Sequence, residues 1–176
     1  MAHERSTDIT HTENPDQKNY DWLYYNALMP HITGNVLDIG SGALQFAREY
    51  SKNPDVRFVT GLDKFTDTTE YPKITCLEWV CPNNFPDELY DTVVSTEFIE
   101  HIEREQLEPL LTQIVSVMTP ESKFVGSTPN KLVPTTNPYH LYEYTKDELH
   151  EILSKYFSKV ETYLVRNDCT VWIASL

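Results

Sequence analysis

The stretch "NVLDIGSGALQFAREY", residues 35–50, decides the fold. Residues 36–39 form a short apolar run that is typical of a buried strand. The two glycines at residues 40–42 predict a tight turn, because glycine adopts backbone conformations that other residues avoid. Residues 44–50 then have a helical pattern. A strand, a glycine turn and a helix in this order form the opening unit of a doubly wound α/β sheet.

The rest of the chain continues this alternation of strands and helices. Apolar runs predict further strands, and apolar residues at helical spacing predict further helices: strands at 56–63, 73–80, 90–96 and 122–128, and helices at 20–29, 103–118 and 145–157. Two final strands are joined by a turn at 166–168 that is too short for a parallel crossover. We therefore predict an α/β fold with a doubly wound, mostly parallel, seven-stranded Rossmann-like sheet and an antiparallel terminal hairpin.

Length and composition predict one domain. The 176 residues suffice for one core, and we assign residues 1–17 to a flexible N-terminal arm and 18–176 to the domain. No apolar run approaches the roughly 18 residues of a membrane helix, and three cysteines without metal-site spacing favour the cytoplasm. A net charge of −13 disfavours a protein that mainly grips a phosphate backbone and favours a small substrate. Oligomeric state is not encoded in any recognisable pattern.

The glycine turn and two acids indicate the kind of ligand. The dinucleotide fingerprint G-x-G-x-x-G fails, because Gln45 stands at its last position. Asp38 precedes the turn, where an acid would repel a phosphate and attract a cation. Asp63 ends the second strand, 23 residues after Gly40, and is placed to accept hydrogen bonds from two ribose hydroxyls. A ligand with a ribose, a positive amine and no phosphate is S-adenosylmethionine.

These motifs resemble those of the class I S-adenosylmethionine-dependent methyltransferases. "VLDIGSG" is similar to their first motif, "VTGLD" to their second and "LYDTVVSTEFIEHI" to their fourth. The resemblance covers residues 20–176, and it departs at Leu44, where many members have a third glycine. The resemblance implies a site for the cofactor. Its methionine end would be lined by Asp38, Gly40, Ser41 and Gly42, and its ribose would be held by Asp63. Its adenine would be bordered by Glu78 or Trp79, and its sulfonium would lie beside Thr96. Trp79 is equally consistent with core packing.

The segment "TEFIEH", residues 96–101, carries two carboxylates and an imidazole. The spacing of Glu97, Glu100 and His101 would place them on one side of a helical turn. Three side chains that project together can chelate a divalent ion such as Mg²⁺ or Mn²⁺. In the metal-free alternative, Glu97 touches the cofactor and His101 packs beneath it. Under either interpretation Glu97 and His101 are the predicted catalytic residues.

A downstream segment, "STPNKLVPTTNPYHLYEYT" at residues 127–145, offers a further imidazole. With E-x-x-E-H it resembles the metal-dependent 2′-O-methyltransferases of small-RNA 3′ ends, and E-x-x-E-H also resembles the O-methyltransferases of ubiquinone biosynthesis. The first resemblance implies a bound divalent ion with the ligands Glu97, Glu100, His101 and His140, and the second implies metal dependence through the E-x-x-E-H element. Tyr142 and Tyr144 fit a substrate pocket and a core position equally well.

The predicted function is methyl transfer from S-adenosylmethionine to a hydroxyl group of a small substrate, such as a sugar, nucleoside or catechol, assisted by Mg²⁺ or Mn²⁺. One alternative is 2′-O-methylation of RNA 3′ ends. The acidity of the chain and its lack of a basic extension argue against this alternative. Another is a module that binds S-adenosylmethionine without turnover. If no metal is bound, N-methylation also remains open.

Overall fold

The computed structural model describes residues 23–65, 69–83, 85–133 and 135–176, so the predicted N-terminal arm lies outside the described residues. A helix at residues 23–28 comes first. It is followed by η2 (Met29–His31), β1 (Gly34–Ile39), α2 (Gln45–Tyr50), β2 (Val56–Asp63), β3 (Ile74–Glu78), β4 (Tyr90–Thr96), η3 (Ile99–His101), α3 (Arg104–Ser116), β5 (Met118–Pro129), α4 (Lys146–Leu153), β6 (Lys159–Val165) and β7 (Cys169–Ser175). Among these helices none is both long and apolar enough to cross a lipid bilayer.

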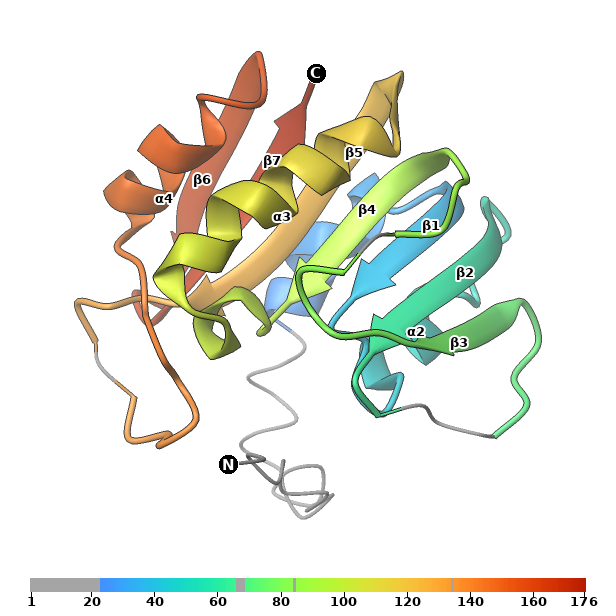
Figure 1. Cartoon of the computed structure of the whole chain (residues 1–176), viewed down its shortest axis with the longest axis horizontal. Coiled ribbons are helices and arrows are strands. Elements are labelled where there is room, and N and C mark those ends of the chain that lie inside the picture. The colour runs from blue at the N-terminus through green and yellow to red at the C-terminus, as the bar shows by residue number, and fades with distance from the viewer. Residues whose placement is uncertain (1–22, 66–68, 84, 134) are drawn as a thin grey trace.

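All seven strands form one sheet in the order β3-β2-β1-β4-β5-β7-β6 (Figure 1). Pairing is parallel from β3 to β5, whereas β7 runs antiparallel to both β5 and β6. This arrangement confirms the predicted doubly wound sheet and its terminal hairpin. The strand order reverses between β1 and β4, and ligands of such sheets bind beyond the carboxyl ends of the strands at this switch point.

The core lies on both faces of the sheet, which explains why β1 reads as a continuous apolar run. Successive strand residues point to opposite faces. Leu37 and Ile39 therefore join the cluster beneath α3 and α4, while Val36 joins the cluster beneath α2 and the first helix. Figure 1 shows α3 and α4 together on one face of the sheet. All three side chains are completely buried, as a central parallel strand requires.

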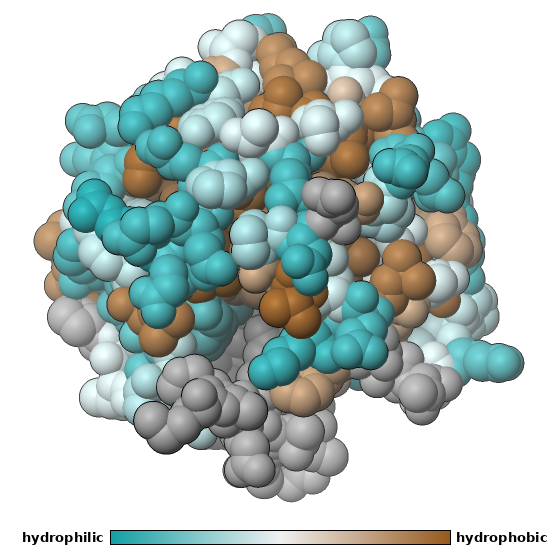
Figure 2. All heavy atoms as spheres, viewed as in Figure 1, coloured by the Kyte–Doolittle hydropathy of each residue, from teal (hydrophilic) through white to brown (hydrophobic). Residues whose placement is uncertain are grey.

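The connection from β3 to β4 contains no helix in its described residues, 79–83 and 85–89. Phe58 on β2 and Leu77 on β3 consequently remain 42% and 40% exposed. Figure 2 shows hydrophobic surface on the part of this face that α3 and α4 leave open, whereas hydrophilic residues prevail over α3 and α4. Trp79 fills part of the uncovered space and packs against Phe85, with ring centroids 5.5 Å apart.

Some predicted boundaries were wrong for local reasons. The helix expected at 103–118 ends at Ser116, and β5 begins at Met118 instead of residue 122. Ser122 makes this extension possible, because its hydroxyl accepts from Thr119 N at 2.8 Å and donates to Tyr90 O at 2.6 Å. These bonds satisfy backbone groups where the β4–β5 register shifts.

The predicted capping box of α4 is confirmed. Thr145 Oγ1 accepts from Glu148 N at 3.1 Å, and the Glu148 carboxylate accepts from Thr145 N at 2.9 Å. Thr145→Ala should lower the free energy of unfolding by about 1 kcal/mol, because the backbone N–H of Glu148 in the first turn loses its acceptor. Urea unfolding measures this loss, with exposed Thr136→Ala as the matched control. Equal stability of the two variants would contradict the capping role.

Candidate active site

The glycine turn after β1 lies at the switch point and is held against β2. Gly40 N and Ser41 N both donate to Leu62 O, at 2.8 and 3.1 Å. Gly40 and Gly42 adopt φ values of +72° and +54°, a region that favours glycine. A Cβ atom on Gly40 would overlap the ring of Phe98. The turn therefore needs glycine at this position for both its backbone conformation and its close contact with Phe98.

Leu44 stands where a third glycine would be expected, and its backbone takes the conformation that glycine favours. It adopts φ +60°, the left-handed conformation that a third glycine would supply. Its side chain is completely buried in the cluster that contains Phe46 and Ala47. Burial of a leucine contributes about 1.5–3 kcal/mol, which offsets the roughly 1–2 kcal/mol of left-handed strain. The departure from the three-glycine pattern is thus compatible with the same turn.

Asp63 connects the end of β2 to the glycine turn. Its Oδ2 accepts from Gly42 N at 2.9 Å, and its Oδ1 accepts from Phe65 N at 3.0 Å. Hydrogen bonds to an ionised group contribute more than neutral ones, about 1.5–3 kcal/mol each. The side chain is only 5% exposed. Asp63 therefore fixes the turn, in addition to its predicted role toward a ribose.

Asp38 is a buried acid beneath the turn. It is 3% exposed, and its Oδ2 accepts from the Tyr50 hydroxyl at 2.8 Å. Burial raises the pKa of Asp38 to about 7; the Tyr50 hydrogen bond opposes this shift, and the Asp63 carboxylate adds to it. A carboxyl group in this state is an energetically favourable partner for a cation, because a positive charge relieves the desolvation of the carboxylate.

This raised pKa predicts a pH-dependent stability. Between pH about 4 and pH about 7 the folded chain retains a proton on Asp38 that the unfolded chain has released. The contribution of Asp38 to stability is therefore full below this window and lost as the pH rises through about 7, by up to about 1.4 kcal/mol per pH unit. Urea unfolding of wild type and Asp38→Asn across the window should show a steeper decline in wild type. Parallel curves would contradict the assignment.

The remaining residues predicted for the cofactor lie at strand ends. Glu78 ends β3, is exposed and pairs in register with Asp63. Thr96 ends β4 and pairs with Ser127 of β5. Trp79 is 6% exposed and belongs to the main core cluster, with its indole Nε1 donating to Asn83 O at 2.9 Å. Of the two alternatives for Trp79, its burial favours core packing.

The expectation that Glu97, Glu100 and His101 share one helical turn was wrong. Glu97 precedes the short 3-10 helix η3 and has φ +50°, so the i, i+3 and i+4 geometry of an α-helix does not apply. Its backbone N donates to Ser127 O at 2.9 Å, and its Oε1 accepts from Ser127 Oγ at 2.8 Å. Left-handed backbone at a glutamate is strained, and such strain is common at functional sites.

Glu100 is a buried carboxylate with one unmatched oxygen. The side chain is completely buried, and Oε2 accepts from Thr128 Oγ1 at 2.9 Å. Among the described residues, Oε1 has no hydrogen-bond partner. Burial raises the pKa of Glu100 well above its ordinary value, and the nearby Glu97 carboxylate raises it further. An unpartnered buried carboxylate oxygen is costly, so this position calls for a proton or a cation.

Two imidazoles complete the surroundings of Glu100. His101 Nε2 lies 3.8 Å from Glu100 Oε1, and the rings of His101 and His140 stand edge to face with centroids 5.0 Å apart. Ligand atoms of Glu100, His101 and His140 all lie within 4.8 Å of one another. Within the described residues, this three-residue group does not include Glu97.

This donor set fits a divalent ion. One carboxylate oxygen with two imidazole nitrogens suits Mn²⁺ and Zn²⁺ well, and Mg²⁺ when further oxygens contribute. The unmatched Glu100 Oε1 is the atom that such an ion would satisfy. Glu97 lies close enough to Glu100 to influence its ionisation, so it neighbours the group without belonging to it.

Sequence reasoning missed the residues that orient these acids. Ser127 and Thr128 at the end of β5 donate to Glu97 and Glu100, and Tyr50 donates to Asp38. Phe98, which covers Gly40, was also missed. The one available signal was "ST" at the end of a strand that neighbours β4. Tyr144 is completely buried and Tyr142 half-buried, which favours the core position for Tyr144.

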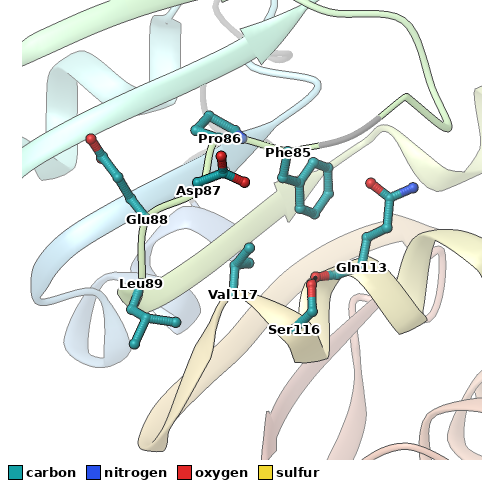
Figure 3. A pocket seen from close by; sticks show the side chains of 8 residues that line it. All are labelled: Phe85, Pro86, Asp87, Glu88, Leu89, Gln113, Ser116 and Val117. Carbon is teal, nitrogen blue, oxygen red and sulfur yellow. Dashed lines mark hydrogen bonds between the residues drawn. The ribbon is translucent and has the colours of Figure 1, made fainter.

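A pocket of about 380 Å³ lies elsewhere in the molecule (Figure 3). Its side chains come from the segment 85–89, which leads into β4, and from the end of α3 with Val117. The pocket therefore opens at the amino end of β4, whereas the clustered acids and imidazoles lie beyond the carboxyl ends of β4 and β5. It is separate from the candidate site.

The comparisons with known proteins bear on the fold. Neither protein-family models nor curated protein sequences gave a match. Solved structures that match include a DhpI complex with S-adenosylhomocysteine (TM-score 0.73, 16% identity, 95% of this chain and 86% of that chain). Another is the N-methyltransferase NodS from Bradyrhizobium japonicum WM9 with the same ligand (TM-score 0.72, 16% identity, 98% of this chain and 93% of that chain). Human N-acetylserotonin methyltransferase with S-adenosylmethionine also matches (TM-score 0.71, 14% identity, 91% of this chain and 54% of that chain). The chain therefore has the α/β fold of S-adenosylmethionine-dependent methyltransferases.

Proposed function

We propose that this protein is an S-adenosylmethionine-dependent methyltransferase that methylates a hydroxyl group of a small substrate with the help of Mg²⁺ or Mn²⁺. The observation that carries the proposal is the buried Glu100 carboxylate. Its unmatched oxygen faces His101 and lies within one compact group with His140. This group stands beyond the carboxyl end of β4, the strand that adjoins β1 and its glycine turn.

The cofactor end of the site would be formed by residues of four strand ends. S-adenosylmethionine would supply a methyl group activated by a sulfonium. Asp38 offers a buried carboxyl group that the cationic end of the cofactor would favour in its ionised form, and Asp63 offers carboxylate oxygens for its ribose. The other residues proposed to border the cofactor are Gly40, Ser41, Gly42, Glu78, Thr96 and, from within the core, Trp79. The similar structures that contain this cofactor or its product support the assignment.

The metal end would be formed by Glu100, His101 and His140, and the neighbouring Glu97 would become the fourth ligand if its side chain turned toward the ion. A divalent ion there would lower the pKa of a substrate hydroxyl and fix its oxygen. The chain itself orients the ligands: Thr128 holds Glu100, Ser127 holds Glu97, and the carbonyl of Tyr139 lies 3.0 Å from His101 Nδ1. Glu97 and His101 are proposed as the catalytic residues that face the acceptor.

The surface next to His140 favours a small acceptor. Exposed apolar side chains lie on the same segment of the chain: Leu132, Val133, Tyr139 and Leu141. These suit a ring or another apolar face, as in a nucleoside or catechol, with a sugar as the more polar possibility. Lys131 is the one basic residue between Lys123 and Lys146, so a long phosphate backbone would find little compensation here.

A methyl-transfer assay tests the proposal. Labelled S-adenosylmethionine would be incubated with a catechol, a nucleoside, a sugar and a short RNA, each with Mn²⁺ and with a chelator. We expect the label on a hydroxyl of a small acceptor, and its loss with the chelator. Transfer that the chelator leaves unchanged would contradict the metal site. Labelling confined to the RNA 3′ end would select RNA methylation instead.

A further inference from the structure

His140 is held on both ring nitrogens by side chains of its own loop. Nδ1 lies 2.7 Å from Glu143 Oε1 and 2.8 Å from Thr135 Oγ1, and Nε2 lies 2.9 Å from Asn137 Nδ2. The side chains of His140 and Glu143 are 10% and 12% exposed. These contacts restrict the ring far more than a loop histidine in solvent would be restricted.

The contacts determine which nitrogen of His140 carries the proton. Asn137 Oδ1 accepts from Tyr139 N at 3.0 Å, so the amide NH₂ of Asn137 must be the group that faces His140. A donor at this position requires a lone pair on Nε2. In the neutral imidazole the proton then resides on Nδ1, where Glu143 accepts it. Nε2 is therefore the nitrogen that could bind a metal, and an ion there would displace the Asn137 amide from its lone pair.

Glu143 is itself fixed. Thr135 Oγ1 donates to Glu143 Oε1 at 2.6 Å, so the carboxylate accepts from the hydroxyl and from the imidazole at once. The loop is tied to the metal ligands through its backbone as well, because Leu141 N donates to Glu100 O at 2.7 Å. The orientation of His140 is thus linked to the main chain of Glu100, the residue that it would join in binding an ion.

We propose that Glu143 is the positioning residue of the metal site: it holds the proton on His140 Nδ1 and so keeps the lone pair on Nε2, which an ion would bind in place of the Asn137 amide. The inference rests on the metal site of the proposed function and adds a residue that does not itself touch the ion. Metal-binding histidines commonly donate their other N–H to a carboxylate, and loss of this partner typically weakens metal binding about 10- to 100-fold.

Nitrogen-15 NMR of the metal-free wild type tests the proton position directly. When its imidazole is neutral, His140 should show a protonated Nδ1 and an unprotonated Nε2. A protonated Nε2 would overturn the inference. This readout needs neither a metal nor an acceptor, so it stands apart from the activity of the protein.

Titration with Mn²⁺, followed by electron paramagnetic resonance, tests the consequence. Glu143→Ala should weaken Mn²⁺ binding about 10- to 100-fold, while Glu143→Gln should lose less, because its amide oxygen still accepts from Nδ1–H. Glu151→Gln, an exposed carboxylate on α4, should bind as wild type does. Binding of S-adenosylhomocysteine should be unchanged in all three.

The binding measurements separate a failure of the Glu143 role from a failure of the metal site. If wild type binds Mn²⁺ and Glu143→Ala binds it equally well, the positioning role is overturned and the metal site stands. If wild type binds S-adenosylhomocysteine but no Mn²⁺, the metal site fails and the inference falls with it. A parallel loss of metal and S-adenosylhomocysteine binding in Glu143→Ala would indicate general disruption and overturn the specific role.

Discussion

Replacing Glu100 by glutamine is expected to abolish metal-dependent methyl transfer and to leave S-adenosylhomocysteine binding intact. The amide oxygen can still accept from Thr128 Oγ1, but the charged oxygen that faces His101 is lost. We expect Mn²⁺ affinity to fall by more than the roughly 10- to 100-fold that is typical of an outer partner. Calorimetric titration with Mn²⁺ and with S-adenosylhomocysteine measures the two affinities separately.

Glu100→Gln should lower the affinity for the metal without lowering the stability of the metal-free protein. A neutral amide avoids the desolvation that raises the pKa of Glu100, so the metal-free variant should be at least as stable as wild type. Glu105→Gln, an exposed carboxylate in the first turn of α3, serves as the control. Unchanged Mn²⁺ binding in Glu100→Gln would contradict the metal assignment.

Gly40→Ala should be the most destabilising single methyl addition in the candidate site. Alanine at φ +72° would be strained by about 1–2 kcal/mol. Its methyl group would also overlap the ring of Phe98, and such overpacking typically costs about 1–3 kcal/mol. Urea unfolding should show the combined loss, together with weaker S-adenosylhomocysteine binding, because the turn must shift.

A double-mutant cycle separates the two causes. Phe98→Leu leaves a smaller side chain over the turn, so Gly40→Ala should be less harmful in that background by about 0.5–3 kcal/mol. The backbone strain would remain. Strict additivity of the two substitutions would show that the contact between Gly40 and Phe98 does not limit the turn.

The sheet could be predicted from local patterns because its central strands, β1 and β4, are buried on both faces. β2 and β4 have the predicted bounds, since segments with proline and charged residues precede both strands and a charged residue follows each. β5 escaped this reasoning, because its first residues are tied down by the Ser122 hydroxyl, a contact with Tyr90 that is distant in sequence.

The candidate site was predictable in composition but not in geometry. The spacing of Glu97 and Glu100 suggested a helix, whereas the strained backbone at Glu97 turns the chain before η3 begins. Ser127 and Thr128 become partners of the two acids through the β4–β5 register, which no local pattern specifies. The proton position on His140 depends on a chain of contacts through Asn137 and Tyr139, which no local sequence pattern specifies.

Thermal unfolding with S-adenosylhomocysteine and Mn²⁺, added separately and together, tests the central claim most directly. A ligand at about 100 times its dissociation constant stabilises the folded state by about 2.7 kcal/mol, which corresponds to about 5–10 °C for a chain of this size. We predict a rise of this order with each ligand and a larger rise with both. No shift with S-adenosylhomocysteine would contradict the methyltransferase assignment, and a shift that is insensitive to Mn²⁺ would contradict the metal site.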